Sequence, residues 1–308
     1  MTGRMPAPEP AWRDYLADPF VLRVGDRYLA VGTEDPPPTE GPVFPLLETD
    51  DLIHWRSRGR ALERVDPSLG SAYWAPEIAY GDGAWWMYYS VGHDISGHHI
   101  RVARSTDPLG PYTDTGAVLT PDERFAIDPH VFRDEDGRRY LFFARDVLEG
   151  ERPGTHLAVA PLDGMQRLAE PAVPALAPWA ESQIYQRDRE MYGARWTWHT
   201  LEGPSVIRRH SRYWMTFSAG AWTGPGYAVT WAVADHPLGP WSPAPETSAP
   251  LLASDDVFIG PGHNSLTIAP DGGDVIVFHS WDSGRERRLM HVRRIEFRPD
   301  GPVVGGAA

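Results

Sequence analysis

Short β-prone runs alternate with turn residues along the whole chain. Apolar residues recur in alternating or continuous runs rich in β-branched and aromatic side chains, and no segment keeps a 3.6-residue apolar period over three helical turns. Gly, Pro, Asp or Asn bounds each run, as expected for strands that are joined by hairpin turns. The runs cover residues 19–33, 84–92, 99–105, 129–144, 204–220, 227–234 and 274–281. This pattern predicts an all-β protein.

The runs repeat with one order of residue types. A polar residue beside Pro or Gly opens an apolar strand, a charged turn follows, and a strand rich in aromatic residues comes next. These units open at Asp18, Glu77, Asp128, Glu202 and His263. A strand followed by [DH]-P-L-G-P and an aromatic residue occurs twice, at residues 99–112 and 227–241. Five units of about sixty residues, each with about four short strands, predict a five-bladed β-propeller.

We expect the propeller to form one catalytic domain over residues 1–308. The predicted blades cover roughly residues 15–65, 73–120, 126–178, 200–250 and 258–300. Residues 179–199 fit no blade pattern and are expected to form an ordered loop between two blades. The innermost strand of each propeller blade runs along a central channel, so the opening residues of the five units should face one shared funnel.

Composition narrows the classes of partner. The chain has 42 acidic and 29 basic residues, and its net charge of -13 repels phosphate backbones and anionic lipid surfaces. Nucleic acids and membranes are therefore poor candidate partners, and the oligomeric state is left open. The absence of cysteine excludes a disulfide framework, a thiolate metal site and a thiol nucleophile. Residues 1–15 contain no apolar signal-peptide core, so we expect a cytoplasmic location.

Three carboxylates in one water-filled funnel suit the hydrolysis of a glycosidic bond. One carboxylic acid has to protonate the leaving oxygen while a carboxylate acts on the opposite face of the sugar. A third carboxylate beside the acid raises the pKa of that acid, because neighbouring like charges disfavour ionisation. A purely structural role is the weaker interpretation, since it is costly to bury several carboxylates together without a function.

These motifs resemble glycoside hydrolase family 43, a family of five-bladed propeller enzymes that cleave arabinofuranosides and xylosides with inversion. The resemblance covers nearly the whole chain, and its motifs are ADP, WAPEI, IDP, EGP, GHN and RLMHVRRI, which begin at Ala17, Trp74, Ile127, Glu202, Gly262 and Arg288. Each short motif is unspecific when it is taken alone. Their joint order at blade spacing is specific.

The resemblance implies roles for individual residues. Asp18 would be the general base, Glu202 the general acid, and Asp128 the residue that tunes and orients the acid. Arg288 matches the arginine of the last blade that reaches the substrate in this family. The assignment of that arginine stays open at this point, because three others lie close to it in sequence: Arg285, Arg287 and Arg293.

Aromatic residues and one histidine complete the candidate site. We expect Trp74, Trp196 and Trp198 to stack on sugar, while the other tryptophans pack between blades. His263 fits two roles, a core histidine or a ligand to a central ion or water. A hard ion such as Ca²⁺ would be held there mostly through waters. We expect hydrolysis to require no metal, because two carboxylates supply both proton transfers.

The leading functional hypothesis is an inverting, exo-acting glycoside hydrolase that removes terminal α-L-arabinofuranosyl units from arabinose- or xylose-containing oligosaccharides. A β-xylosidase or an endo-arabinanase on the same scaffold stays open as an alternative. From another class, the alternative is a non-catalytic sugar-binding propeller. A sugar-binding module needs no base opposite an acid, and a protein-interaction scaffold needs no acids at three blade openings.

Overall fold

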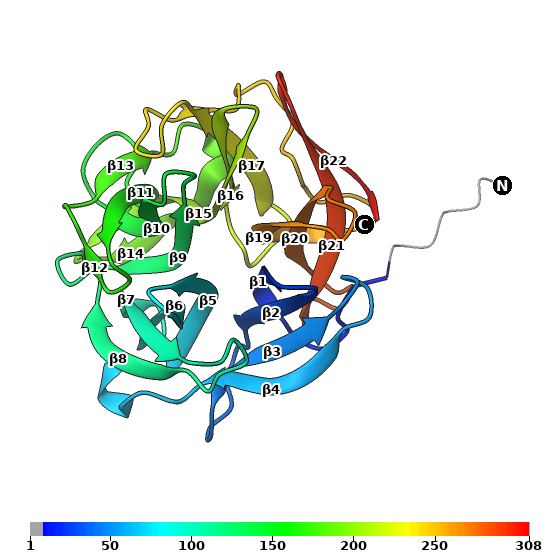
Figure 1. Cartoon of the computed structure of the whole chain (residues 1–308). Helices are drawn as coiled ribbons and strands as arrows, with labels where there is room; N and C mark the ends of the chain where they lie inside the picture. The colour runs from blue at the N-terminus through cyan, green and yellow to red at the C-terminus, as the bar shows by residue number, and fades with distance from the viewer. Residues whose placement is uncertain (1–8, 308) are drawn as a thin grey trace.

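The strands of this protein form five groups around a central axis (Figure 1). The computed structural model describes residues 9–307. The first two groups are β1 (Ala17–Val24), β2 (Arg27–Thr33), β3 (Val43–Thr49) and β4 (Arg56–Leu62), then β5 (Ala72–Gly81), β6 (Ala84–His93), β7 (Ser96–Ser105) and β8 (Thr113–Val118). The third is β9 (Ala126–Arg133), β10 (Arg139–Val147), β11 (Gly154–Asp163), β12 (Arg167–Leu168) and β13 (Val173–Leu176). The fourth is β14 (Ile184–Met191), β15 (Ala194–Arg209), β16 (Arg212–Ala219), β17 (Ala228–Ala234) and β18 (Ser242–Pro243). The last is β19 (Ile259–Ile268), β20 (Asp274–Trp281), β21 (Arg288–Arg298) and β22 (Gly301–Ala307).

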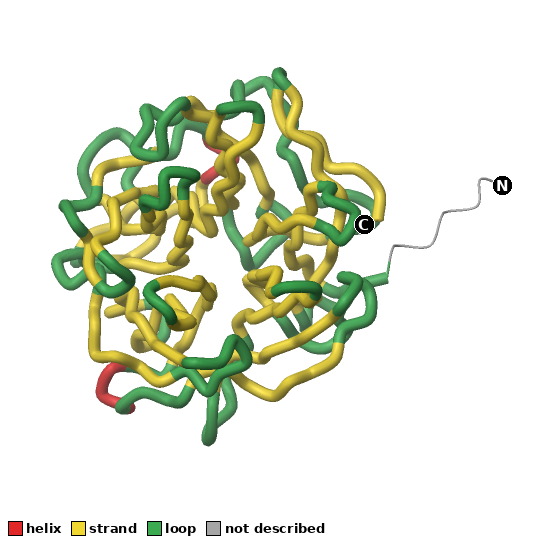
Figure 2. The backbone as a smooth tube through the Cα atoms, viewed as in Figure 1, coloured by secondary structure: helices red, strands yellow, loops and turns green. Residues whose placement is uncertain are grey.

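The architecture is the expected five-bladed β-propeller. Successive strands within a blade pair antiparallel, as in the orders β1-β2-β3-β4, β5-β6-β7-β8 and β19-β20-β21-β22. Strands β1, β5, β9 and β19 lie nearest the centre of the ring (Figure 1). Almost all of the remaining backbone is loop or turn, and the two short 3-10 helices are η1 (Pro67–Leu69) and η2 (Glu181–Gln183) (Figure 2). Among residues 9–307, no helix is long and apolar enough to cross a membrane.

The segment between the third and fourth blades differs from the expectation. Residues 179–199 were expected to form a loop, but most of them belong to a β-hairpin of β14 and β15. The polar residues of this hairpin hide its alternation, because half of the residues of β14 are exposed and none is buried. Gly154 and Thr155 of β11 pair in parallel with His199 and Thr200 of β15. This pairing joins the third and fourth blades into one ten-stranded sheet.

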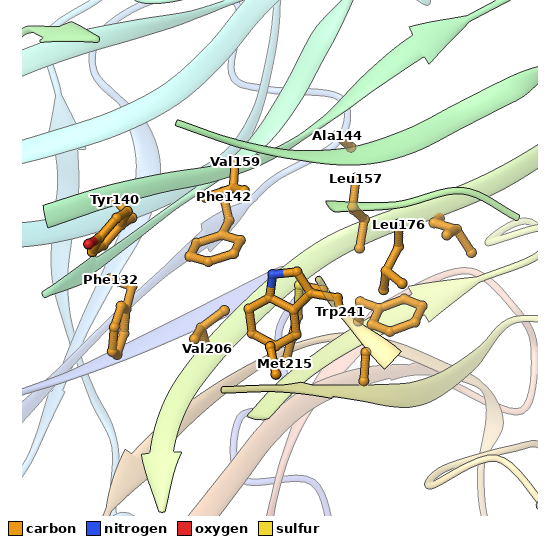
Figure 3. Packing of buried hydrophobic residues seen from close by; sticks show 14 of the residues in the cluster. Phe132, Tyr140, Phe142, Ala144, Leu157, Val159, Leu176, Val206, Met215 and Trp241 are labelled. Atoms are coloured by element: carbon orange, nitrogen blue, oxygen red, sulfur yellow. The ribbon is translucent and has the colours of Figure 1, made fainter. Parts of the chain in front are cut away.

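Five apolar clusters fill the five interfaces between neighbouring blades. The cluster between the third and fourth blades holds Phe142, Val206 and Met215 around Trp241 (Figure 3). Separate clusters lie between the first and second, second and third, and fourth and fifth blades. A further cluster joins the fifth blade to the first, so the ring of contacts is continuous. Apolar burial of this kind is the main favourable contribution to folding.

The repeated [DH]-P-L-G-P-aromatic motif is a packing device. Its aromatic residue is Tyr112 in the second blade and Trp241 in the fourth, and each is buried in the cluster against the preceding blade. The Tyr112 hydroxyl donates to the carbonyl oxygen of Pro108, and the Trp241 indole N–H donates to that of Pro237, both at 3.0 Å. Within each motif, the hydrogen bond satisfies the polar atom of the aromatic side chain, and the ring fills the interface with the preceding blade.

A bulge with a left-handed residue occurs in the innermost strand of every blade. The pairing register shifts at this point in β1, β5, β9, β15 and β19. The left-handed residues are Asp18, Ala75, Asp128, Gly203 and His263, with φ between 44 and 59°. A bulge re-aims the side chain that it carries, and bulges are common next to active sites. The repeat therefore brings one residue per blade to the axis.

The N–H groups that the bulges release are taken up by the preceding blade. The donors and acceptors are Asp18 to His279 (3.0 Å), Ala75 to Thr33 (2.8 Å), Gly203 to Asp128 (2.9 Å) and His263 to Ser218 (2.7 Å). A buried N–H without a partner would be costly, so each of these side chains satisfies a donor that the strand pairing leaves open. The bonds also tie the innermost strands of these four blades to the preceding blade.

The ring closes through the segment that precedes β1. The backbone N–H groups of Ala11 and Leu16 donate to the carbonyl oxygens of Met290 and Arg288 in β21, at 2.8 and 3.0 Å. Leu16 is fully buried in the cluster between the last and first blades. The first blade is thereby hydrogen-bonded to the last.

Truncation of Leu16 tests this closure. We expect Leu16→Ala to lower the free energy of unfolding by about 2–5 kcal/mol, because the substitution removes buried methyl groups and leaves a cavity at the closing interface. Urea unfolding of the variant and the wild type measures the difference. Leu69→Ala, at a side chain that is 38% exposed, serves as the control and should change stability by no more than about 0.5 kcal/mol. A loss as small as that of the control would contradict a closing role for Leu16.

Candidate active site

The bulges bring the predicted catalytic carboxylates together at one end of the central channel. Asp18, Asp128 and His263 line this channel with Glu77. Glu202 immediately precedes the left-handed Gly203 and borders a cleft that opens beside the channel. Glu77 and Glu202 are therefore not equivalent to the other opening residues, because the left-handed positions of their blades belong to Ala75 and Gly203.

Asp18 is held as an ionised carboxylate. It is 8% exposed, and its Oδ1 lies 3.5 Å from Nη1 of Arg288 and 3.4 Å from Nδ1 of both His263 and His279. Burial alone would raise the pKa of Asp18, but these neighbours hold it at about 2. Burial lowers the pKa of both histidines, which leaves them neutral near pH 7. Arg288 is therefore the cation that keeps Asp18 charged.

Asp128 and Glu202 form a second region of the site, in which the protonated form of a carboxyl is favoured. Burial raises the pKa of Asp128 well above its usual value, and the nearby charges of Glu202 and Asp18 raise it further. Burial also raises the pKa of Glu202, to about 7, and Asp18 adds to this effect. The two carboxyls interact and therefore titrate as a pair. Together they retain a proton at a pH where Asp18 has none.

Tyr227 orients the Glu202 carboxyl. Its hydroxyl donates to Oε1 of Glu202 at 2.6 Å, and its ring stacks on His279 with centroids 5.9 Å apart. Gly262 makes room for this ring, because a Cβ at that position would lie 1.8 Å from a ring carbon of Tyr227. The glycine of the GHN motif is thus required by the close approach of a tyrosine from the preceding blade.

Glu77 supports the site from the second blade. Its carboxylate lies 2.9 Å from Nδ1 of His130, whose Nε2 accepts the backbone N–H of Val206 at 3.0 Å. Since Nε2 is an acceptor, the ring proton is on Nδ1 and is donated to Glu77. This chain of contacts ties the second, third and fourth blades together beneath Asp128.

The structure resolves the choice among the arginines of the last blade. Arg288 is 5% exposed, and its Nε donates to the Tyr15 hydroxyl at 2.9 Å. Its guanidinium also lies 4.6 Å from the centroid of the Trp222 ring. The other three bond elsewhere, Arg285 to a backbone carbonyl, Arg287 to Asp282, and Arg293 to the carbonyl of Val292. Only Arg288 of these four reaches the carboxylate cluster.

The three tryptophans that were expected to stack on sugar lie in different environments. Trp74 lines the cleft and stacks on His98 with centroids 3.8 Å apart. Trp198 also lines the cleft, but it is 1% exposed and the Arg189 guanidinium covers its ring, so the ring has little surface to offer a sugar. Trp196 does not line the cleft, and its indole N–H donates to the carbonyl of Met191. Its position in β15 of the hairpin, rather than in a loop, keeps it away from the cleft.

Several residues of the site carry no local sequence signal. Tyr227 directly precedes β17, His279 lies on β20, and Asp146 and Arg189 reach the cleft from β10 and β14. The pairing of strands that are distant in sequence brings these residues to the site. The sequence next to each of them therefore carries no recognisable motif. Gly262 was the one available hint, since a glycine inside a strand indicates close approach of another group.

The donor set around His263 does not fit a metal held by protein ligands. Within residues 9–307, no group of three or more His, Asp or Glu side chains is arranged to hold an ion. Nδ1 of His263 lies 3.4 Å from Asp18 and 3.9 Å from Asp128, distances that fit charge contacts within the carboxylate cluster. No step of the chemistry is therefore derived through a metal.

Comparisons with known proteins agree with this geometry. The family model described as "Glycosyl hydrolases family 43" matches residues 7–303. The β-D-galactofuranosidase xynD of Aspergillus niger is 26% identical over 98% of this chain and 86% of its own length. The α-L-arabinofuranosidase 43 of Humicola insolens is 29% identical over 83% of this chain and 53% of its own length, so the chain spans about half of that relative.

A solved structure supports both fold and family. The crystal structure of a thermostable family-43 glycoside hydrolase superimposes with a TM-score of 0.80 at 28% identity, over 95% of this chain and 93% of that one. Several relatives are named as extracellular enzymes, so the expected cytoplasmic location gains no support from them.

Removal of the Tyr227 hydroxyl tests the electrostatics of Glu202. The hydrogen bond from Tyr227 favours the ionised carboxylate and lowers its pKa, so Tyr227→Phe should raise the titration midpoint of Glu202 from about 7 by about one pH unit. Carbon-13 NMR of labelled glutamate measures this, and Glu202→Gln identifies the resonance. Tyr28→Phe, which removes a hydroxyl bonded to Ile268, is the control. An unchanged midpoint in Tyr227→Phe would show that the bond does not act on ionisation.

Proposed function

The chain belongs to glycosyl hydrolase family 43, and from this premise we propose that it cleaves glycosidic bonds with inversion, with Asp18 as general base and Glu202 as general acid. The observation that carries the proposal is the contrast between these two carboxyls. Asp18 has a pKa of about 2 and Glu202 one of about 7, although both are buried. Acid and base assignments follow from such a divergence of pKa values.

The proposed reaction proceeds in one displacement. Ionised Asp18 accepts a proton from a water, whose oxygen attacks the anomeric carbon. Protonated Glu202 gives its proton to the leaving oxygen as the glycosidic bond breaks. Asp128 titrates together with Glu202, so the pair holds the proton that the acid needs, and its carboxylate accepts the backbone N–H of Gly203 at 2.9 Å. In this proposal no metal ion takes part, because the two carboxyls carry both proton transfers.

We propose that the preferred substrate is an oligosaccharide with a terminal α-L-arabinofuranosyl unit. The cleft beside Glu202 has a solvent-accessible volume of about 70 Å³, well below the ~300–1,000 Å³ of sites that enclose larger ligands. So small a volume supports a short oligosaccharide rather than a long chain held along the cleft, and the names of several relatives as exo-α-(1→5)-L-arabinofuranosidases support the removal of single terminal sugars. The name of the Humicola insolens relative supports arabinofuranose as the sugar.

A second candidate substrate is a β-D-galactofuranoside. The relative that bears this activity in its name matches almost the whole chain. The two sugars share the configuration of the furanose ring, and galactofuranose carries one additional hydroxymethyl group. β-Xylosidase and endo-arabinanase activities, which the sequence also left open, are decided by the same experiment.

The experiment compares nitrophenyl glycosides of arabinofuranose, galactofuranose and xylose with arabinan fragments of increasing length. We expect the highest kcat/KM on the arabinofuranoside and the release of single arabinose units from chain ends. Proton NMR of the first product should show the inverted anomer. Retention of configuration would overturn the mechanism, and faster cleavage of long arabinan than of trisaccharides would overturn the exo assignment.

Substitution of each carboxyl separates the two catalytic roles. Glu202→Gln should lower kcat/KM by about 10²–10⁴-fold on a disaccharide and much less on an activated phenyl glycoside, whose leaving group needs no proton. Asp18→Asn should lower both rates alike, since both reactions need the attacking water. Glu190→Gln, at an exposed carboxylate on the hairpin, is the control. Equal losses for Glu202→Gln on the two substrates would contradict its role as the acid.

A further inference from the structure

Arg189 stands in the cleft with its guanidinium clamped between two aromatic rings. The hairpin of β14 and β15 places its Cζ 4.7 Å from the centroid of the Tyr185 ring and 5.3 Å from that of Trp198. All three residues line the cleft together with Glu202. Stacking on aromatic rings fixes the plane of a guanidinium and leaves the N–H groups at its edge free to donate.

The guanidinium of Arg189 has no bonded partner among residues 9–307. It makes neither a hydrogen bond nor an ion pair there, whereas its hairpin neighbours Arg187 and Arg195 are paired with Glu181 and Glu190. Asp146, which also lines the cleft, already accepts hydrogen bonds from the Thr155 and Tyr192 hydroxyls at 2.9 and 2.7 Å. The N–H donors of Arg189 are therefore available to a molecule in the cleft.

The cleft lies on the side of the proposed acid. Its lining includes Glu202 but neither Asp18 nor Asp128, which line the central channel instead. In an inverting mechanism the leaving group is next to the acid, and the attacking water is next to the base. A sugar that departs from Glu202 therefore enters the space that Arg189 faces.

We propose that Arg189 is a specificity-determining residue that binds the leaving-group sugar through a pair of neighbouring hydroxyl groups. The inference rests on the proposed function and extends it to the second sugar of the substrate. A planar guanidinium presents two parallel N–H donors, which match two adjacent hydroxyl oxygens. The ring of Trp74, which also lines the cleft, offers an apolar face to the same sugar.

The hairpin is the element that makes this selection possible. Residues 184–209 form the hairpin of β14 and β15. Tyr185 lies on β14 and Trp198 on β15, so one element carries both rings of the clamp. Trp198 is buried and donates its indole N–H to the Thr155 hydroxyl at 3.3 Å. The clamp is therefore anchored to the third blade, and Arg189 is positioned before a substrate binds.

Two substrates with the same terminal sugar test the proposal. One is a nitrophenyl glycoside, whose leaving group has no hydroxyl pair, and the other is the matching disaccharide. Arg189→Met keeps a long apolar side chain between the rings and removes the donors. We expect it to lower kcat/KM on the disaccharide by about 10- to 100-fold, the range for loss of a charged hydrogen-bond donor, and on the nitrophenyl glycoside by less than about threefold.

A lysine variant and a control separate hydrogen bonding from charge. Arg189→Lys keeps the positive charge near Glu202 without the paired donors, so it should keep the wild-type pH profile and still lose most of the activity on the disaccharide. Arg187→Met removes an arginine from the same strand outside the cleft and should leave both rates unchanged. Either Arg189 variant suffices for the comparison of substrates if the other fails to fold.

The outcomes are distinguishable. Equal losses on both substrates, or no loss on the disaccharide, would overturn the role of Arg189 while the wild-type activity upholds the proposed function. A wild-type protein that cleaves neither substrate would overturn the proposed function and the inference together. A selective loss on the disaccharide in both Arg189 variants establishes Arg189 as a contact of the leaving-group sugar.

Discussion

Closure of the ring is the constraint on which the site depends. The blades supply one bulged strand each, and the carboxylates come from the first, third and fourth of them. Asp18 faces Asp128 and Glu202 only because the last blade hydrogen-bonds to the segment before β1 and packs on Leu16. The hydrogen bonds between neighbouring blades have the same origin, since the bulges of four innermost strands each leave an N–H that the preceding blade satisfies. Assembly of the catalytic centre and closure of the fold are therefore one event.

The repeat could be predicted from the sequence because turn residues and aromatic strands recur in one order. The five-bladed fold, the family and the meeting of Asp18, Asp128 and Glu202 all follow from that repeat. The predicted alignment of the units differs from the structure in the second and fourth blades. There the residues equivalent to Asp18 and Asp128 are Ala75 and Gly203, each followed by Pro, and not the acids Glu77 and Glu202. Local order shows which strands exist, but only backbone geometry shows which residue of a strand faces the axis.

The hairpin and the residues around the carboxylates could not be predicted in the same way. The hairpin alternates weakly because one of its strands is exposed, so polarity concealed its secondary structure. Tyr227, His279 and Arg288 act through contacts between strands that are distant in sequence. Their effect is a division of the site into a region that favours charge, around Asp18, and a region that favours protons, around Glu202. This division comes from burial and from the placement of one guanidinium, neither of which a motif encodes.

The parallel pairing of β11 with β15 has a mechanical consequence. It places Asp128 and Glu202 on one continuous hydrogen-bonded sheet, whereas Asp18 is carried by a separate four-stranded sheet. Backbone hydrogen bonds resist displacement more than apolar contacts between sheets do, because they are directional. We therefore expect the acid and its neighbour to move together, with relative motion concentrated in the gap between their sheet and the sheet that carries the base. The width of that gap, which has to admit a water molecule and a sugar ring, is the adjustable dimension of this catalytic centre.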